Sequence, residues 1–371
     1  MKRLLTRLAL VAVGLTLAVV AAELLLRAFP SVLSEDARLR IHWAGLGASD
    51  SNTVAHPTIG YVARSGPDRL ERSDLAFDFT IDPNGFRNPW PWPASAEVVV
   101  VGDSLSFSYG VDDERGWSDE LERRHPEMEL VNLAIVGGAP QMAARAFEAY
   151  GEALEPKLLI FGLFLGNDVY DAGRFAAWRE NDGGEKNFGL WRAFGGRPPG
   201  WMGELYRLAG KSYLVAGLRD VKREKNRPPS TLELSGGGRV QLVPDTIGSG
   251  FVSGPQATKF RLVANAVEQA HQRCQANGTR LAVLFFPTKE EVYLPLTESD
   301  PPDLSIPFAK HFRGLGIDVI DPGPALRAGA LEGRQLYFEI DGHPNQAGYD
   351  VIADVVDAWL EEQGPGIGLS L

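Results

Sequence analysis

Four short segments of the sequence carry side chains that could together perform acyl transfer. The first, GDSLSFSYG at 102–110, places Ser104 directly after a run of β-branched residues, where a serine hydroxyl is held in the open for nucleophilic attack. The last, YFEIDGHPNQAGYD at 337–350, places His343 just before Asn345, which we expect to cap a final helix. The positive end of that helix disfavours a charged imidazole, and a general base requires a neutral one.

Two further segments carry groups that could stabilise a developing oxyanion. In NLAIVGGAP at 132–140, the glycine pair lets the backbone approach a ligand closely, or forms only a tight turn. In FLGND at 164–168, Asn167 either directs an amide donor into the site or closes a turn. Ser104 taken alone is best explained as a helix N-cap. Together the segments supply a nucleophile, a base and oxyanion donors, which is the set that acyl transfer needs.

The elements that must position these groups alternate between strands and helices. EVVVV at 97–101 is a short, continuous β-branched run, which is typical of a strand buried on both faces of a parallel sheet. The alternation predicts βαβ units and an α/β fold, with functional groups gathered beyond the carboxyl ends of the strands. Further strands are expected at 128–133, 157–165, 280–286 and 316–321, and helices at 117–124, 141–154, 258–277 and 346–362, the last ending at Gly364.

Composition excludes several classes of protein. With 371 residues, 44% hydrophobic and 23% charged, the chain is an ordinary globular protein and wholesale disorder is excluded. The net charge of -11 argues against nucleic acid as a partner. Cys274 is the only cysteine, so neither an internal disulfide nor a cysteine zinc cluster is possible. The six histidines are scattered without the spacing of metal ligands.

The first thirty residues differ from the rest. MKRLLTR is basic, and the nineteen residues from Leu8 to Leu26 contain one charge, Glu23. The segment is either a signal peptide cleaved after Ala21 or Ala22, or an uncleaved membrane anchor. We favour the anchor, because the apolar run continues past the cleavage site. Both interpretations place the rest of the chain outside the cytoplasm, since the positive flank stays inside.

Three regions are expected along the chain. Residues 1–30 form the anchor or signal peptide, 31–95 an N-terminal extension with short strands such as 75–81, and 96–371 the main domain. An insertion at about 172–255 interrupts the βα rhythm and is rich in glycine, proline and tryptophan. Its aromatic residues either pack a small core of their own or belong to a lid over the site. The tryptophans in question are Trp178, Trp191 and Trp201.

The four segments together resemble the SGNH/GDSL hydrolase superfamily. The resemblance lies in GDSLS (102–106), NLAIVG (132–137), GND (166–168) and DGHPN (341–345), in the order that the superfamily has them. It covers roughly residues 97–171 and 258–362 and extends to exported bacterial members, some of which are polysaccharide O-acetyltransferases. It implies a three-layer α/β/α sandwich with a mainly parallel, flavodoxin-like central sheet.

The resemblance also implies roles for the matching residues. Ser104 is the expected nucleophile and His343 its base. The oxyanion hole is formed by the N–H of Ser104, the N–H of Gly137 and the side chain of Asn167. Gly138 is the substitute for Gly137 if the segment is shifted by one residue.

The acid of the implied triad is Asp341, two residues before the histidine. The commonest form of the superfamily has it three residues before, where this chain has Ile340, whereas the polysaccharide acetyltransferase relatives use the closer spacing. In an extended segment, residues two apart face the same side, so the Asp341 carboxylate can reach the His343 imidazole.

These residues predict a serine-dependent acyl-ester hydrolase acting on an O-acylated carbohydrate or lipid of the cell envelope, without cofactor or metal. One alternative is an O-acetyltransferase that passes the acyl group to a polysaccharide hydroxyl. Another is a non-catalytic carbohydrate-binding or assembly protein with the same fold. A metal-dependent hydrolase using His343, Asp341 and Asp168 is disfavoured, because no further ligand stands at a suitable spacing. Beyond the substrate, the expected partner is the membrane, through the N-terminal helix.

Overall fold

The computed structural model divides the chain into two compact units, which are described separately. The first unit comprises Met1–Ser51 and Leu190–Pro228, and the second comprises Asn52–Gly189 and Pro229–Leu371. The predicted functional residues all belong to the second unit. The residues that the structure describes are 2–34, 37–38, 41, 52–72, 74–182, 188, 209, 211–226, 230–242, 255–297 and 303–371.

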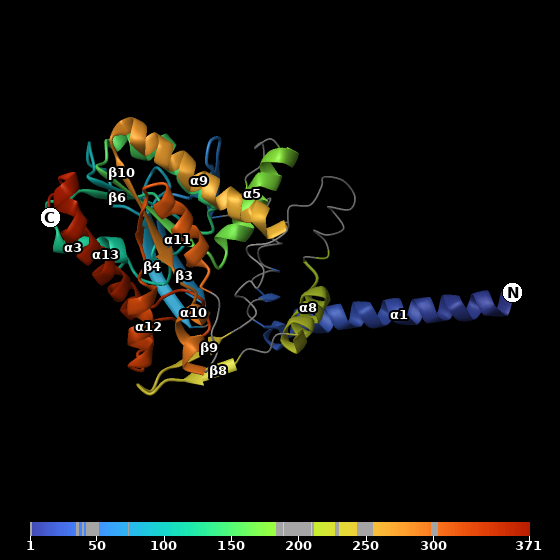
Figure 1. Ribbon diagram of the computed structural model, residues 1–371. Coiled ribbons are helices and arrows are strands. Elements are labelled where there is room, and N and C mark those ends of the chain that lie inside the picture. The colour runs from blue at the N-terminus through green and yellow to red at the C-terminus, as the bar shows by residue number, and fades with distance from the viewer. Residues whose placement is uncertain are drawn as a thin grey trace. The chain divides into compact units, whose positions relative to one another are not determined.

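A five-stranded sheet forms the centre of the second unit (Figure 1). Its spatial order is β11-β10-β7-β5-β6 and every neighbouring pair is parallel, so the predicted α/β fold with a flavodoxin-like sheet is confirmed. The four valines of β5 are fully buried, which explains why this strand is apolar at every position. The strands are β5 (Val98–Val101), β6 (Leu130–Asn132), β7 (Leu158–Phe164), β10 (Arg280–Phe286) and β11 (Asp318–Ile320).

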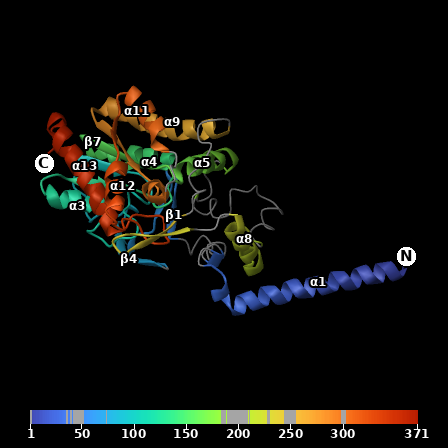
Figure 2. The ribbon, with the colours of Figure 1, turned by 60° about the horizontal axis from the view of Figure 1, so that its bottom comes forward.

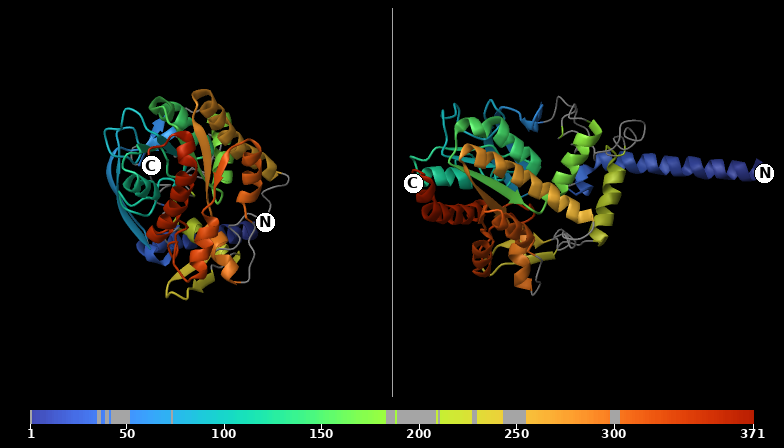
Figure 3. Two further views of the ribbon diagram at one scale, coloured as in Figure 1. Left: turned by 60° about the vertical axis from the view of Figure 1, so that its left-hand side comes forward. Right: turned by 45° about the horizontal axis from the view of Figure 1, so that its top comes forward.

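Helices cover both faces of this sheet and complete three layers (Figures 1 and 3). Helices α3 and α13 pack against each other on one face, and α4, α5 and α9 on the opposite face. The predicted helix at 141–154 is a short α-helix continued by a π-helical and a 3-10 turn. The bounds are α3 (Trp117–Arg124), α4 (Pro140–Ala146), α5 (Asp168–Asp182), α9 (Pro255–Asn277), α10 (Lys289–Tyr293), α11 (Ser305–Gly314), α12 (Gly323–Leu331) and α13 (Gln346–Ile367).

The final helix is longer than the sequence predicts. The expected stop at Gly364 is wrong, because α13 continues through Pro365 to Ile367. The left-handed conformation that ends the helix is adopted by Gly368, with φ of 72°. Pro365 is tolerated this close to the end, where few further helical bonds depend on it.

Two β-hairpins precede the sheet. In the second, residues alternate between buried and exposed, and the buried face presents Leu75, Phe77 and Ile81 to Phe107 and Tyr109 of the segment that carries Ser104. The hairpin therefore supports the predicted nucleophile. The strands are β1 (Thr53–His56), β2 (Gly60–Ala63), β3 (Gly66–Arg72) and β4 (Leu75–Ile81), the last with the bounds expected from the sequence.

The expected insertion contributes to both units. In the second unit, Trp178 of α5 is buried against Phe175 and Phe188, as a small local core requires, and β8 (Ser230–Glu233) pairs with β9 (Arg239–Leu242). Trp191 and Trp201 lie outside the described residues, so a lid formed by them stays a prediction.

The first unit contains the apolar helix α1 (Lys2–Ala28). An 18-residue stretch of this helix has a mean hydropathy of 2.4 and no buried residue, so by length and composition the helix could cross a membrane or serve as a signal sequence. Its single internal acid, Glu23, accepts hydrogen bonds from Ser212 and from the first backbone N–H groups of α8 (Tyr213–Asn226). The two helices consequently lie in contact (Figures 1 and 2).

Candidate active site

The segment after β5 holds Ser104 in a series of turns. Gly102 has φ of 154°, and a Cβ there would lie 2.1 Å from the Ser106 hydroxyl, so only glycine fits. No helix begins at Ser104, because the next one in the chain, α3, starts at Trp117. The interpretation of this serine as a helix N-cap is therefore wrong, and its hydroxyl is available for another role.

The structure brings three of the predicted residues together. Ser104 Oγ lies 2.8 Å from His343 Nε2, and His343 Nδ1 lies 2.5 Å from Asp341 Oδ1. All three side chains are largely buried: Ser104 is 6% exposed, and the His343 and Asp341 side chains are 20% and 13% exposed. With the imidazole proton on Nδ1 donated to the carboxylate, Nε2 is the acceptor that faces the serine hydroxyl.

Asp341 reaches the histidine through a bend rather than along an extended segment. The prediction of extended backbone is wrong, since residues 339–343 form bends. Asp341 Oδ1 also accepts the backbone N–H of His343 at 2.9 Å, which fixes the carboxylate to the residue whose ring it contacts. The short spacing of two residues is thus spanned by an Asp turn, which places the carboxylate against the His343 ring.

The position of His343 is fixed on both sides. Its ring lies against the Tyr109 ring, with centroids 4.6 Å apart, and its carbonyl accepts the N–H of Phe338. Asn345 caps α13 by accepting from the N–H of Gly348 at 3.1 Å, as the sequence predicts. The imidazole therefore stands next to the positive end of that helix.

The expected oxyanion donors stand close to the serine turn. Ile135 donates its N–H to the Gly102 carbonyl at 3.0 Å, which joins the loop of Gly137 to the turn that precedes Ser104. Gly137 has φ of 67°, a conformation that favours glycine. Gly138, the substitute, donates its N–H to the Ile135 carbonyl at 2.7 Å.

Asn167 lies in the turn that leads from β7 into α5, and its role as an oxyanion donor stays a prediction. Its carbonyl accepts the N–H groups of Tyr170 and Asp171, so its backbone starts α5. Its side-chain amide favours the charged form of Asp103, the neighbour of Ser104, and so acts to lower the pKa of that carboxyl.

Two buried carboxyl groups lie beneath the site. Burial raises the pKa of Asp103 to about 6, although a bond from Leu105 N–H and the nearby His343 favour the charged form. Burial likewise raises the pKa of Asp168 well above its usual range, and the neighbouring Asp103 and Asp171 add to this. Asp168 accepts the N–H of Phe164, so it joins the end of β7 to the start of α5. Its contacts are those of a structural carboxyl.

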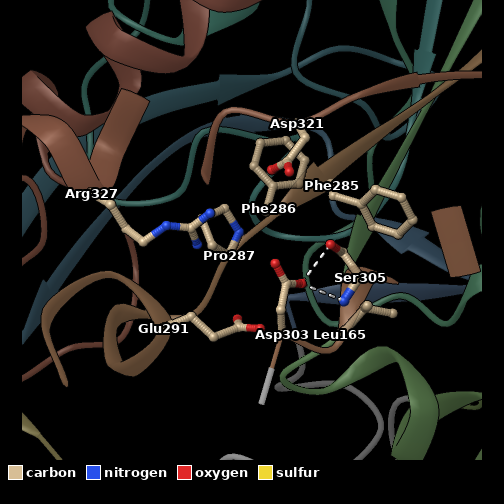
Figure 4. Close-up of a pocket in the computed structure, with 9 residues that line it drawn as sticks. All are labelled: Leu165, Phe285, Phe286, Pro287, Glu291, Asp303, Ser305, Asp321 and Arg327. Atoms are coloured by element: carbon tan, nitrogen blue, oxygen red, sulfur yellow. Dashed lines mark hydrogen bonds between the residues drawn. The ribbon is translucent and has the colours of Figure 1, made fainter. Parts of the chain in front are cut away.

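Possible metal ligands and one small cavity can be compared with the predicted site. No group of three histidine, cysteine or acidic side chains among them could hold a metal ion. A cavity of about 10 Å³, the volume of roughly one water, lies at the end of β10 between acidic side chains and Arg327 (Figure 4). Asp303 there accepts two hydrogen bonds from Ser305. The residues that line this cavity include none of the predicted site residues.

Sequence reasoning missed three charged residues that hold the catalytic segments. Arg87 donates to the carbonyls of Phe107, Ser108 and Val111 in the serine segment. Lys289 and Asp74 contact the turn that carries Asp341. Lys289 stands three residues after the end of β10, within the helix-capping pattern Thr288–Glu291, and its place near a strand end was the one available signal.

Comparison with known proteins identifies the kind of domain. Residues 251–369, which include Asp341 and His343, match the family described as SGNH hydrolase-like domain, acetyltransferase AlgX. The chain carries an SGNH hydrolase-like domain. The resemblance to the SGNH/GDSL superfamily is thereby confirmed, and the domain supports acyl-ester hydrolysis or acetyl transfer as the class of reaction. None of the curated proteins matches the chain.

Solved structures similar to the SGNH hydrolase-like domain include two lipolytic proteins of the G-D-S-L family. The one from Desulfitobacterium hafniense is 14% identical, with 71% of this chain and 99% of that chain covered and a TM-score of 0.38. The one from Veillonella parvula is 13% identical, with 70% and 94% covered and a TM-score of 0.36. The esterase EstA from a Pseudoalteromonas species is 15% identical, with 71% and 99% covered and a TM-score of 0.32. Identities of this size transfer neither substrate nor activity.

Proposed function

We propose that the chain is a serine-dependent acyl-ester hydrolase with Ser104 as nucleophile, His343 as base and Asp341 as the acid that orients the imidazole. The observation that carries the proposal is the relay of contacts, 2.8 Å from Ser104 Oγ to His343 Nε2 and 2.5 Å from His343 Nδ1 to Asp341 Oδ1. Such a relay lowers the cost of charging the imidazole when it takes the serine proton.

The reaction follows from this geometry. Ser104 Oγ attacks the ester carbonyl while His343 Nε2 takes its proton, and Asp341 stabilises the imidazolium. The N–H groups of Ser104 and Gly137 and the Asn167 amide hold the tetrahedral oxyanion. Its collapse expels the alcohol, which receives the proton from His343, and water then releases the acid in the same two steps.

The substrate class proposed is an O-acylated carbohydrate or lipid of the cell envelope. The support is the apolar helix α1, which is suited to hold the domain at a membrane, together with the matched family. In this proposal α1 stays uncleaved and the catalytic domain lies outside the cytoplasm, with the basic residues at 2–7 on the inner side.

O-acetyl transfer is the second candidate, and the description of the matched family as acetyltransferase favours it. The same residues serve both reactions, because only the group that attacks the acyl-enzyme differs. A sugar hydroxyl, deprotonated by His343, takes the place of water.

The test is incubation of the full chain with an activated acetyl ester, with and without acetyl-free oligosaccharides. Acetate release without acceptor supports the hydrolase, and acetylated oligosaccharide supports the transferase. Ser104→Ala and His343→Gln should lose at least about 1,000-fold in kcat. His311→Gln is the matched control, since His311 Nε2 pairs with Glu268 at 2.7 Å and its ring lies near Phe260 and Phe312 rather than a proposed site residue.

Labelling with a fluorophosphonate tests the nucleophile without a substrate. Wild type should be modified at Ser104 and Ser104→Ala should not be. A folded wild type that resists modification, and releases no acetate, would sink the proposal in favour of a carbohydrate-binding protein.

A further inference from the structure

Lys289 is a buried cation with an unusual set of partners. It is 3% exposed, and its Nζ lies 3.3, 3.0, 3.1 and 3.0 Å from the carbonyl oxygens of the four consecutive residues 338–341. These residues are called here the acid turn, because they end at Asp341. An ammonium has three N–H groups and no acceptor, so the carbonyls of the acid turn are sufficient to satisfy it.

Burial of this ammonium is costly unless its surroundings compensate. Burial lowers the pKa of Lys289, while the neighbouring carboxylates Glu290, Asp341, Asp74 and Glu339 act in the opposite direction. The compensation thus comes from the carbonyl dipoles of the acid turn and from acids around it. A charged Lys289 ammonium therefore holds the carbonyl groups of the acid turn in place.

The N–H groups of the acid turn are held by a charge of the opposite sign. Asp74 Oδ2 accepts the backbone N–H of Ile340 at 2.5 Å and that of Asp341 at 3.1 Å. Asp74 lies in the turn between β3 and β4, while Lys289 begins α10 after β10. Two distant segments of the second unit therefore meet the acid turn, one with an anion and one with a cation.

We propose that Lys289 and Asp74 are positioning residues, which clamp the acid turn so that the Asp341 carboxylate stays against His343; this inference rests on the proposed function. Asp341 uses its N–H for Asp74, its C=O for Lys289 and its carboxylate for His343. Because its side chain is short and the spacing is only two residues, the place of the carboxylate is set by the backbone that the clamp holds.

Lys289→Met keeps most of the aliphatic stem and removes the ammonium. We expect kcat for an activated ester to fall about 100-fold with KM within about twofold, since a small displacement of a catalytic group has this effect and no substrate contact is lost. Lys310→Met, at an exposed lysine of α11, is the matched control and should leave both constants unchanged. An unchanged kcat in folded Lys289→Met would overturn the clamp.

A double-variant cycle distinguishes positioning from general support. If Lys289 acts through Asp341, kcat of the double variant Lys289→Met/Asp341→Asn should lie within about threefold of kcat of Asp341→Asn alone. A full further loss of about 100-fold in the double variant would assign Lys289 a merely structural role.

Asp74→Ala keeps the inference testable if Lys289→Met does not fold. We expect it to lower kcat about tenfold. Asp78→Ala is its control in the same hairpin, because that side chain is 65% exposed and pairs with Arg69. Equal kcat for Asp74→Ala and Asp78→Ala would contradict the clamp.

Proton NMR tests the clamp without turnover. The short contact between His343 Nδ1 and Asp341 predicts a resonance far downfield for the shared proton. It should persist in Ser104→Ala and Asp78→Ala, and shift or vanish in Lys289→Met and Asp74→Ala. If wild type cleaves no ester, the proposed function fails while this measurement still judges the clamp. An unshifted resonance in both variants would overturn it.

Discussion

At the scale of single residues, Asp341 is the position where the structure adds most. Its carboxylate both accepts from the histidine ring and closes the turn back to the histidine N–H. Asn at this position can keep the turn, but its amide does not stabilise an imidazolium as a carboxylate does.

We therefore expect Asp341→Asn to lower kcat by about 100-fold or more while the free energy of unfolding changes little. Steady-state kinetics and urea unfolding of the same preparation check both parts. A loss of less than about threefold would mean that another group orients the imidazole.

Asp103 gives a prediction on pH. Its folded pKa of about 6 lies above its ordinary value of 3.8, so the folded state holds the proton more tightly. The stability that this contributes is fully present below about pH 4 and is lost as the pH rises through 6.

Asp103→Asn removes this loss. The free energy of unfolding of Asp103→Asn minus that of wild type should therefore increase by on the order of 2 kcal/mol between pH 4 and pH 7. Urea titrations at both pH values measure this difference. Asp78→Asn, on the exposed face of β4, should show no such trend. A difference that stays constant with pH would contradict the prediction.

The sequence predicts the residues with a motif and misses those without one. Ser104 and His343 stand in recognisable segments at strand ends, and the structure places them in contact. Lys289 and Asp74 are ordinary charged residues whose role depends on which distant backbone they meet. That depends on the packing of three segments, which local periodicity does not specify.

At the scale of elements, the β3–β4 hairpin has the largest bearing on the site. Phe77 is fully buried and its ring lies 5.0 Å from that of Tyr109, which in turn lies against His343. Aromatic packing thus connects a hairpin outside the sheet to the catalytic base.

Phe77→Ala should lower the free energy of unfolding by about 3–5 kcal/mol, as large cavities in cores do. Urea unfolding measures this, with Val54→Ala as the control because Val54 is 47% exposed on β1. A loss below about 1 kcal/mol would show that the hairpin packs loosely.

The bounds of strands and helices were predicted best where a single pattern of apolar residues marks the element. The bounds of β10, β4 and α3 agree with the sequence because apolar runs and capping residues mark both ends. The end of α13 does not, because Gly364 and Gly368 are both suited to stop a helix and only the tertiary fold selects between them. The bend at 339–343 has no pattern that separates it from an extended segment.

At the scale of the whole molecule, the apolar helix α1 is the feature on which the proposed membrane location depends. Every large side chain of α1 that faces outward is apolar over several turns, and Leu15 and Leu17 are each 64% exposed. A surface of this kind is stable in hydrocarbon rather than in water.

The double variant Leu15→Arg/Leu17→Arg should move the chain from the membrane fraction to the soluble fraction. Each arginine raises the free energy of inserting the helix by about 3 kcal/mol at the centre of a bilayer. Carbonate extraction and immunoblotting measure the distribution. Leu331→Arg, at an exposed position of α12, is the control. Unchanged membrane retention of the double variant would argue against anchoring by α1.

In the proposed mechanism, the separation of 239 residues between Ser104 and His343 also determines when the site can assemble during synthesis. At about 5–20 residues per second, the ribosome needs roughly 10–50 s to add the base after the nucleophile. Throughout that interval the proposed nucleophile lacks its base. In the proposed exported topology, a chain that crosses the membrane before it folds would present no assembled Ser104–His343 pair to the esters and thioesters of the cytoplasm.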